Sequence, residues 1–308
     1  MLSVARRREA RIAYLFLLPA IIIFVLGLIV PLWNAFQLSF HDLPMGTPWA
    51  DREWVGFEQY TRMFSDSGVW SSVWVTLRFS FWVLVIEMLL GLALALMLEK
   101  PIFGASVFRT IFILPLMVSP VAVGLIWRYL LDGRIGLINY YLESIGEAIP
   151  PLQAIGFTSH TWLGEPGLAF FAIIITDIWQ WTPFIFIILL AGLQALPSEV
   201  VEASYIDGAN WWQMTLFVKL PMLRSIILVT ILMRLIDVFR ALEVIFILTF
   251  GGPGRSTEVL SLNIYKTAFT AQAAGYAATI SILLLAIMLI LSIGLLFISN
   301  PLTEGEDN

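Results

Sequence analysis

A polar stretch, LPSEVVEASYIDGANWWQMTLFVKLP (residues 196–221), separates two long apolar segments of the chain. It predicts two short helices joined by a turn. Ser198 is placed to cap the first helix, with Glu199 in the opening turn, where a negative charge suits the helix dipole. Asp207-Gly208 predicts the stop of this helix, because glycine tolerates the left-handed backbone that ends many helices.

The second helix of the stretch carries its own start and end signals. Asn210, followed three residues later by Gln213, resembles a capping box, in which each side chain bonds the other residue's backbone N–H. Pro221 is expected to limit this helix. The loop from 196 to 223 is therefore predicted to be a compact helix-turn-helix at the face of a membrane.

The segments around this loop are apolar enough to cross a membrane. A spanning helix needs about 20 predominantly apolar residues, and six segments meet that test: 13–40, 73–98, 104–130, 167–193, 225–249 and 273–298. The first and third contain prolines (Pro19 and Pro31, Pro115 and Pro120), which predict kinks rather than extra spans. The whole chain, 1–308, is predicted to be one all-α integral membrane domain with six transmembrane helices.

The composition supports a membrane protein. Of the 308 residues, 59% are hydrophobic and 13% charged, and the mean hydropathy is +0.90, which excludes a soluble fold of this size. The absence of cysteine excludes disulfides, thiolate metal sites and cysteine nucleophiles. A single basic cluster near the N-terminus gives no support for nucleic-acid binding, and the isolated His41 and His160 predict no metal site.

The orientation of the chain is predicted from basic residues near the span ends. With six spans, both termini lie on one side. If that side is the cytoplasm, the inner segments carry Arg6, Arg7, Arg8, Arg11, Lys100, Arg109, Lys219 and Arg224. The outer segments carry Arg52, Arg62, Arg128, Arg134, Arg255 and Lys266. Because the flank of the first span weighs most, both termini are predicted to be cytoplasmic.

The N-terminal apolar run is interpreted as a retained helix. It is longer than the apolar region of a secretory signal peptide, and no small-x-small cleavage site follows it. The outward loops are then 41–72, 131–166 and 250–272. Their aromatic residues fit an interfacial belt or, alternatively, a surface for a partner protein.

Charged side chains inside the spans point to a polar route through the membrane. Ionisable groups in a bilayer generally face a cavity or a partner. Those inside the predicted spans include Arg78, Glu87, Asp177, Arg234, Asp237, Arg240 and Glu243. The last four recur every three residues, so neighbours share a helix face and can form ion pairs of alternating sign. Internal neutralisation and contact with a solute both remain open, whereas Arg78 and Glu87 are assigned to helix packing or snorkelling.

The polar loop also resembles a known signature. Glu202-Ala203-Ser204, then Asp207-Gly208-Ala209 and, further on, Leu220-Pro221 are similar to the EAA signature of permease subunits in binding-protein-dependent ABC importers. The likeness is greatest to the carbohydrate-uptake type, which includes the maltose and glycerol-3-phosphate systems. Ser204 stands in place of the second alanine and Val218 where isoleucine is usual. Weaker likenesses follow in order along most of the chain, among them Phe16-Leu17-Leu18-Pro19-Ala20 and Gly251-Gly252-Pro253-Gly254.

This resemblance implies a type I ABC-importer permease fold in a bacterial or archaeal cell (inner) membrane. It implies that the loop is the coupling helix, which contacts a cytoplasmic ATPase through Glu202, Ala203, Ser204, Asp207, Gly208, Ala209, Leu220 and Pro221. The expected partners are a second related permease, two ATP-binding subunits and an extracytoplasmic solute-binding protein. ATP and Mg are expected in the partner ATPase, with no cofactor bound by this chain.

The resemblance also implies positions for the solute pathway. Transferred from the maltose-system permease, they fall on Asp177, Gln180, Trp181 and Phe184 in the fourth span, and on Arg234, Asp237, Val238 and Ala241 in the fifth. Aromatic rings can stack on the apolar face of a sugar or polyol. The charged Arg234, Asp177 and Asp237 depart from what maltose requires and favour a different solute.

Other functional classes receive less support. The sequence has no phosphate-binding loop of the G-x-x-x-x-G-K-[ST] type and no nucleophile elbow, so no enzyme is predicted. An ion-coupled secondary transporter is the alternative, because charged residues in spans can serve proton or sodium coupling. The loop could also be an amphipathic connector without a partner.

Overall fold

The structure is a computed structural model that describes residue 14 and residues 16–99 and 103–298. The basic residues Arg6, Arg7, Arg8, Arg11 and Lys100, on which the predicted orientation partly depends, lie outside the described residues, as does the start of the first predicted span. The elements are η1 (Val25–Ile29), α2 (Val30–Leu38), β1 (His41–Asp42), η2 (Trp49–Asp51), β2 (Glu53–Trp54), α3 (Glu58–Ser65), α4 (Ser67–Met97), α5 (Ala105–Met117), α6 (Pro120–Leu130), α7 (Leu137–Ala148), η3 (Pro150–Ile155), α8 (Pro166–Gln194), α9 (Ser198–Ile206), α10 (Trp211–Met214), η4 (Thr215–Lys219), α11 (Leu220–Phe239), α12 (Glu243–Leu248), α13 (Leu260–Tyr265), η5 (Lys266–Thr270) and α14 (Ala274–Ile298).

Five described helices are long and apolar enough to cross a membrane. They are Phe16–Leu38, Ser67–Met97, Pro166–Gln194, Trp211–Leu248 and Ala274–Phe297. A bent pair, α5 with α6, passes the same test as a broken span or a re-entrant loop, which brings the number to as many as six. Each predicted segment overlaps one of these elements. A multi-pass membrane protein follows from this pattern.

The bend between α5 and α6 has a local cause. The two helices meet at 99°, with Val118 and Ser119 between them. Both residues are extended, with ψ values of 134° and 137°. Pro120 follows directly, and a residue before proline avoids the helical conformation because of the clash with the ring. The predicted kink therefore lies at this junction, whereas Pro115 is accommodated inside α5.

The chain divides into two compact units. The first contains residues 1–66 and 264–283. In it, β1 pairs antiparallel with β2, with His41 opposite Trp54. Tyr276 Oη donates a hydrogen bond to Asp66 Oδ2 at 2.8 Å, and Thr279 Oγ1 donates to Ser39 O at 3.0 Å. These bonds fix the start of α14 within this unit.

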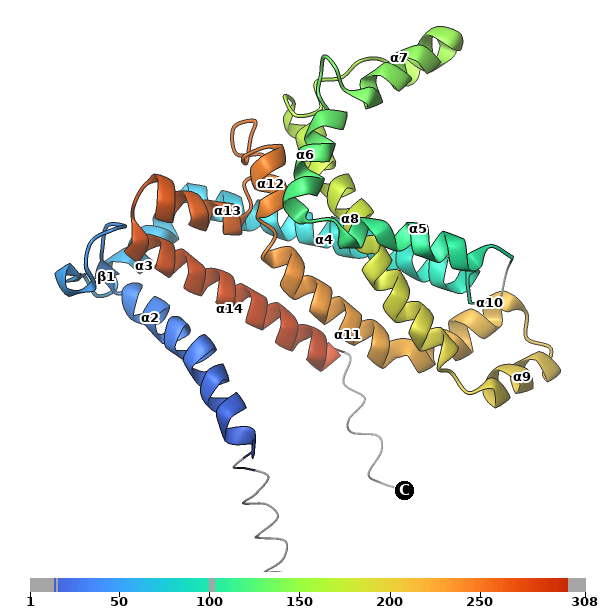
Figure 1. Ribbon diagram of the computed structural model, residues 1–308, viewed down its shortest axis with the longest axis horizontal. Helices are drawn as coiled ribbons and strands as arrows, with labels where there is room; N and C mark the ends of the chain where they lie inside the picture. Colours follow the sequence, from blue (N-terminus) through green and yellow to red (C-terminus); the bar gives the residue numbers. More distant parts are fainter. Residues whose placement is uncertain (1–13, 15, 100–102, 299–308) are drawn as a thin grey trace, which may run out of the picture. The chain divides into compact units, whose positions relative to one another are not determined.

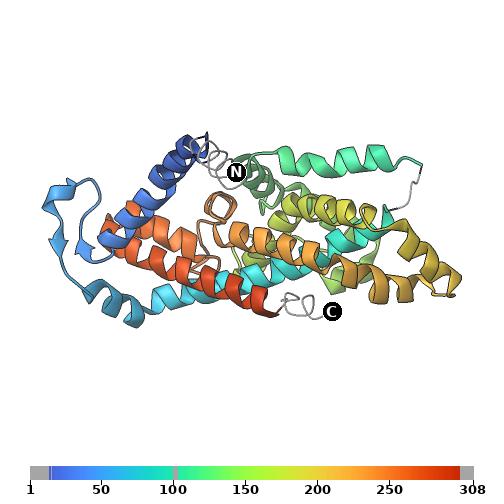
Figure 2. The ribbon, with the colours of Figure 1, turned by 90° about the horizontal axis from the view of Figure 1, so that it is seen from below.

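The second unit contains residues 67–263 and 284–308. In it, α4, α8 and α11 pack against one another (Figures 1 and 2). Their shared core contains Ala95, Ile185, Phe186, Leu189, Leu190, Leu193 and Leu223. Close approach of α4 to α8 requires Gly91, where a Cβ would lie 2.6 Å from Ile185 Cγ2 and 3.2 Å from Phe186 N. The prediction of a single transmembrane domain stays a prediction.

The polar loop forms α9, a turn and α10. Gly208 has φ +81° directly after α9, as expected for the stop. The predicted capping box is confirmed: Asn210 N donates to Gln213 Oε1 and Gln213 N donates to Asn210 Oδ1, both at 2.9 Å. Glu199 lies in the first turn of α9, also as predicted.

Two local predictions for this loop are wrong. Ser198 is the first residue of α9 and not its cap, because Pro197 takes the preceding position and no side chain caps the helix. Pro221 does not limit the second helix. The chain continues from α10 through the π-helical turn η4 into α11, where Pro221 lies in the first turn. The wider turn before Pro221 accommodates a ring that has no N–H to donate.

The charged series in the fifth span is interrupted. Arg234 pairs with Asp237 as predicted, but α11 ends at Phe239 and α12 begins at Glu243. Among the described residues, no ion pair joins Arg240 to Asp237 or Glu243. The expectation of a continuous ladder of ion pairs is therefore wrong, because the helix that would align the side chains ends before Arg240.

Candidate functional site

Arg234 in α11 is the centre of a buried charge cluster, with a side chain only 1% exposed. Its Nε donates to Glu87 Oε2 at 2.7 Å and its Nη2 to Glu87 Oε1 at 3.0 Å. Nη1 donates to Asp237 Oδ2 at 2.9 Å, and Nη2 also donates to Asp177 Oδ1. Glu87 belongs to α4 and Asp177 to α8, so one guanidinium connects three helices.

The rigid fork of an arginine suits this role. Its planar group presents five donors in a fixed geometry, which lets it bond several carboxylates at once. Burial of charged groups is expensive unless they are paired and hydrogen-bonded. The side chain of Glu87 is 0% exposed and that of Asp177 is 6% exposed. The ion pairs within the cluster therefore neutralise charges that the surrounding apolar side chains could not.

Glu87 is the residue of this cluster that the sequence did not identify as part of the site. It was assigned to helix packing or snorkelling, and snorkelling is wrong because the side chain is fully buried. The signal was present, since an acidic residue in an apolar span needs a cationic partner on some other helix. The sequence does not show that α4 packs against α11. Only this packing places Arg234 beside Glu87. Arg78, by contrast, packs over the ring of Phe170 in α8, 4.6 Å from its centroid.

A pocket of about 260 Å³ opens beside the cluster. It is lined by Pro120, Asp177, Trp181, Arg234, Asp237, Arg240, Ala241, Leu242, Glu243 and Val244. The side chain of Asp237 is 42% exposed, so it is the open carboxylate of the cluster. The ring of Trp181 lies against the Arg234 guanidinium, 4.9 Å from centroid to Cζ.

Five of the eight predicted pathway residues line this pocket, namely Asp177, Trp181, Arg234, Asp237 and Ala241. The other three support it. Gln180 is buried and its Nε2 donates to Val118 O at 3.1 Å, at the bend between α5 and α6. Phe184 meets Trp181 edge to face, with centroids 6.2 Å apart. Val238 is buried in α11.

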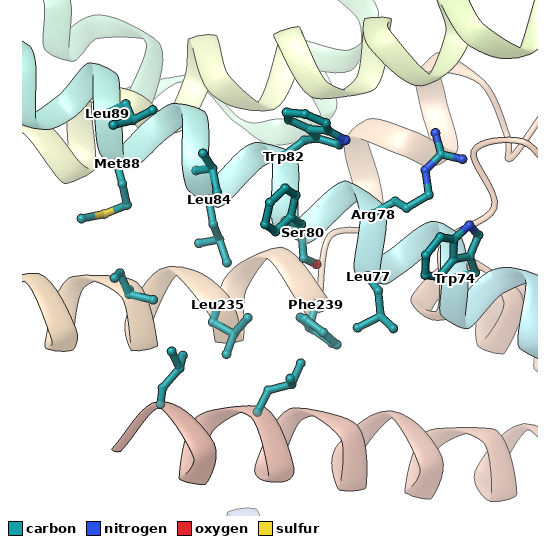
Figure 3. Close-up of a pocket in the computed structure, with 15 residues that line it drawn as sticks. Trp74, Leu77, Arg78, Ser80, Trp82, Leu84, Met88, Leu89, Leu235 and Phe239 are labelled. Carbon is teal, nitrogen blue, oxygen red and sulfur yellow. The ribbon is translucent and has the colours of Figure 1, made fainter. Parts of the chain in front are cut away.

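A larger pocket, of about 780 Å³, lies elsewhere in the second unit between α4, α11 and the end of α14. Figure 3 shows the α4 side chains Leu84 and Met88 facing Leu235 and Phe239 of α11. This lining is almost wholly apolar and offers a hydroxylated solute few hydrogen-bond partners. The smaller pocket beside Arg234 is therefore the better candidate for a polar pathway.

The predicted coupling residues lie at the opposite end of α8, in the loop that follows it. Glu202, Ala203, Asp207 and Gly208 are exposed, and Ser204 and Ala209 are half-buried. Further along, Leu220 is half-buried and Pro221 exposed. Large apolar side chains are also uncovered in this loop, including Ile206, which is 86% exposed, and Trp212. Exposed apolar surface of this kind is typical of sites that contact another protein or the membrane.

The comparisons with known proteins decide the family. The model of the binding-protein-dependent transport system inner membrane component matches residues 87–300. The chain belongs to this family. The matched residues of this permease include Glu87, Asp177 and Arg234, together with the whole loop from 196 to 221.

The alignments with two named relatives extend over more than nine-tenths of the permease. It is 34% identical to the trehalose/maltose transport system permease protein MalF of Thermococcus litoralis, over 93% of each chain. It is 28% identical to a probable starch degradation products permease, AmyD, of Thermoanaerobacterium thermosulfurigenes, over 91% of this chain and 92% of that one. A solved bacterial ABC transporter that imports the acidic polysaccharide alginate shares its fold, with a TM-score of 0.79, 23% identity and coverage of 99% and 100%.

Proposed function

We propose that this permease is the transmembrane subunit of an ATP-driven importer for a sugar or a related polyhydroxylated solute. The observation that carries the proposal is the pocket beside Arg234, an acceptor-rich opening among helices that are otherwise apolar. Relatives named for trehalose and maltose, and for starch degradation products, support a carbohydrate cargo. Membership of the binding-protein-dependent family supports ATP-driven import over ion-coupled transport.

The chemistry of the pocket suits hydroxyl groups. Asp237 and Glu243 offer carboxylate acceptors, and Arg240 offers guanidinium donors. A hydroxylated solute that leaves water needs such replacement partners. Trp181 adds an aromatic face beside the charged cluster, where a sugar ring can stack. Asp177 and Ala241 also line the pocket, and Gln180, Phe184 and Val238 support it from behind.

The loop from 196 to 223 is proposed to be the coupling helix. Its contact residues for the ATPase are Glu202, Ala203, Ser204, Asp207, Gly208, Ala209, Leu220 and Pro221. The complex then contains a second related permease, two ATP-binding subunits and an extracytoplasmic solute-binding protein. The solved alginate importer in complex with its pentasaccharide-bound periplasmic protein supports the last of these partners.

The bent pair α5–α6 counts as one span, which gives six spans and places both termini and the coupling loop in the cytoplasm. The protein resides in the cell (inner) membrane of a bacterium or archaeon. ATP and Mg bind the partner ATPase, and this chain binds no cofactor and carries out no hydrolysis.

The test uses the complete transporter in proteoliposomes, with uptake measured separately under ATP and under a proton or sodium gradient. Uptake that requires ATP supports the proposal, and uptake driven by the ion gradient alone overturns it. Gly208→Val is expected to abolish ATP-driven uptake while the chain still inserts, because φ +81° disfavours a β-branched residue. Gly46→Val is the matched control, since Gly46 also has positive φ and open space around it. Normal uptake by the Gly208→Val variant would mean that the loop does not couple the ATPase to transport.

A further inference from the structure

A second ion pair joins the 196–223 loop to the residue that lies just after α4. Lys219, the last residue of η4, directs Nζ to Glu99 Oε2 at 2.5 Å and Oε1 at 2.8 Å. The Lys219 side chain is 3% exposed and that of Glu99 is 18% exposed. Glu99 lies just beyond the end of α4 at Met97. Lys219 is therefore buried and Glu99 half-buried, and removal of Glu99 leaves an uncompensated buried charge on Lys219.

The two buried ion pairs connect the same two elements. Glu99 follows α4 and Glu87 lies within it, whereas Lys219 and Arg234 lie on the helix that runs from η4 into α11. The two acidic residues are 12 residues apart in the chain, and the two basic residues are 15 residues apart. At 1.5 Å per residue, these separations correspond to about 18 Å and about 22 Å. One pair lies at the end of the 196–223 loop, and the other includes Arg234, which lines the pocket.

The second element is helical over the whole stretch from Lys219 to Arg234, and α4 is helical from Glu87 to Met97, two residues before Glu99. α4 is a single helix from Ser67 to Met97, and the second element is helical from Thr215 through Phe239. Ala95 and Leu223, which lie between the two pairs in the sequence of each element, belong to the same buried core. Two helical elements joined by ion pairs at two separate points cannot slide independently, because sliding would break these pairs and disturb the packing between them.

We propose that Glu99 and Lys219 are positioning residues that make α4 and the η4–α11 helix move together when the coupling loop is displaced. The pair thereby carries the movement of the loop to Arg234 and the pocket, which rests on the proposed function of the loop. Neither residue lines the pocket beside Arg234, and neither is among the contact residues proposed for the ATPase. Loss of the pair leaves both sites intact but disconnects them.

The experiment uses the complete transporter with its solute-binding protein and ATPase subunits. Glu99→Gln is measured for uptake, for stimulation of ATP hydrolysis by the solute-loaded binding protein, and for co-purification of the ATPase. Stimulation and uptake are expected to fall about fivefold or more, the usual lower range for coupling between sites, while co-purification is unchanged. Exchange of the charges in Glu99→Lys with Lys219→Glu is expected to restore both activities.

The control is Arg224→Gln, which removes an exposed charge from the same helix that carries Lys219. It is expected to leave stimulation and uptake unchanged. Wild-type uptake in Glu99→Gln overturns the proposal. Loss of the ATPase from the Glu99→Gln complex also overturns it, since the pair would then support docking alone. If Gly208→Val uncouples transport and Glu99→Gln does not, the inference fails and the proposed function stands.

A cross-linking measurement covers the case in which Glu99→Gln does not accumulate. The chain contains no cysteine, so Glu99→Cys with Lys219→Cys provides its only two thiols. A short bifunctional methanethiosulfonate is expected to restore solute-stimulated hydrolysis to this double variant, and reduction is expected to remove it again. If the cross-link leaves hydrolysis uncoupled or blocks residual uptake, the two residues must separate during transport, which contradicts the proposal.

Discussion

Arg234 and Glu87 form a two-point ion pair in which Nε and Nη2 bond the two carboxylate oxygens at 2.7 and 3.0 Å. The guanidinium then has Nη1 left for Asp237, while Nη2 also reaches Asp177. All three guanidinium nitrogens are thus hydrogen-bonded. Glu87, the carboxylate that is bound at two points, is also the least exposed to solvent. Glu87 holds the arginine, and Asp237 remains open to the pocket.

We expect Arg234→Met to destabilise the transporter strongly. The substitution leaves Glu87 and Asp177 buried without their cation, and breaking a buried ion pair from one side costs about 3–5 kcal/mol. Thermal unfolding of the purified complex measures the loss. Arg240→Gln is the control, because Arg240 has no ion pair in the described part of the chain and lies at the pocket surface. Equal stability of Arg234→Met and wild type would contradict the role of Arg234 as a helix link.

The two carboxylates of Arg234 are expected to respond differently to neutralisation. Glu87→Gln should lower stability by about 3–5 kcal/mol, because it breaks a fully buried pair. Asp237→Asn should change stability by about 1 kcal/mol or less, because its side chain is 42% exposed. Instead, Asp237→Asn should raise the KM for uptake about tenfold or more, since it removes a charged hydrogen-bond acceptor from the pocket.

Uptake kinetics and thermal unfolding of the same two preparations separate these effects. An unchanged KM for Asp237→Asn would remove Asp237 from the solute pathway. A stable Glu87→Gln with a raised KM would reverse the two roles.

Much of the fold could be predicted from hydropathy, because apolar length alone distinguishes spanning helices from loops. The capping box at Asn210 and the stop at Gly208 were also predictable, since both depend on neighbours within a few residues. Pro221 was not, because the π-helical turn before it is a response of the backbone rather than a property of any one residue. The break in α5–α6 was visible as prolines, although not its 99° angle.

The site was predictable only where its residues follow one another on one helix. Arg234 and Asp237 are three residues apart, and their pair follows from helix geometry. Glu87 and Lys219 each have a partner at a distance of more than one hundred residues in sequence. Such partners depend on which helices pack together, and a single sequence carries no direct signal for that choice. The Glu87–Arg234 and Glu99–Lys219 pairs were therefore found from the structure.

Loss of the capping box should weaken the coupling loop selectively. Asn210→Ala removes the acceptor for Gln213 N and leaves an unsatisfied donor at the start of α10. A lost N-cap costs about 1 kcal/mol, so we expect α10 to fray and the affinity for the ATPase to fall about fivefold. Titration of the detergent-solubilised permeases with the ATPase measures this affinity. Ser198→Ala is the control, because the Ser198 side chain caps no helix, and equal losses in both variants would contradict a specific role for the cap.

Gly91 should be the least replaceable glycine of the α4–α8 contact. A Cβ there would lie 2.6 Å from Ile185 Cγ2, 3.1 Å from Ile185 Cβ and 3.2 Å from Phe186 N, so the helices must separate to admit it. Gly91→Ala is expected to lower stability by about 1–3 kcal/mol, as overpacking does in well-packed cores. Gly294→Ala tests the same change where nothing lies within 4 Å, and there alanine should be neutral or stabilise by about 0.5–1 kcal/mol. Thermal unfolding of both variants decides the matter, and equal shifts would mean that backbone propensity, rather than the contact with α8, determines the need for glycine at position 91.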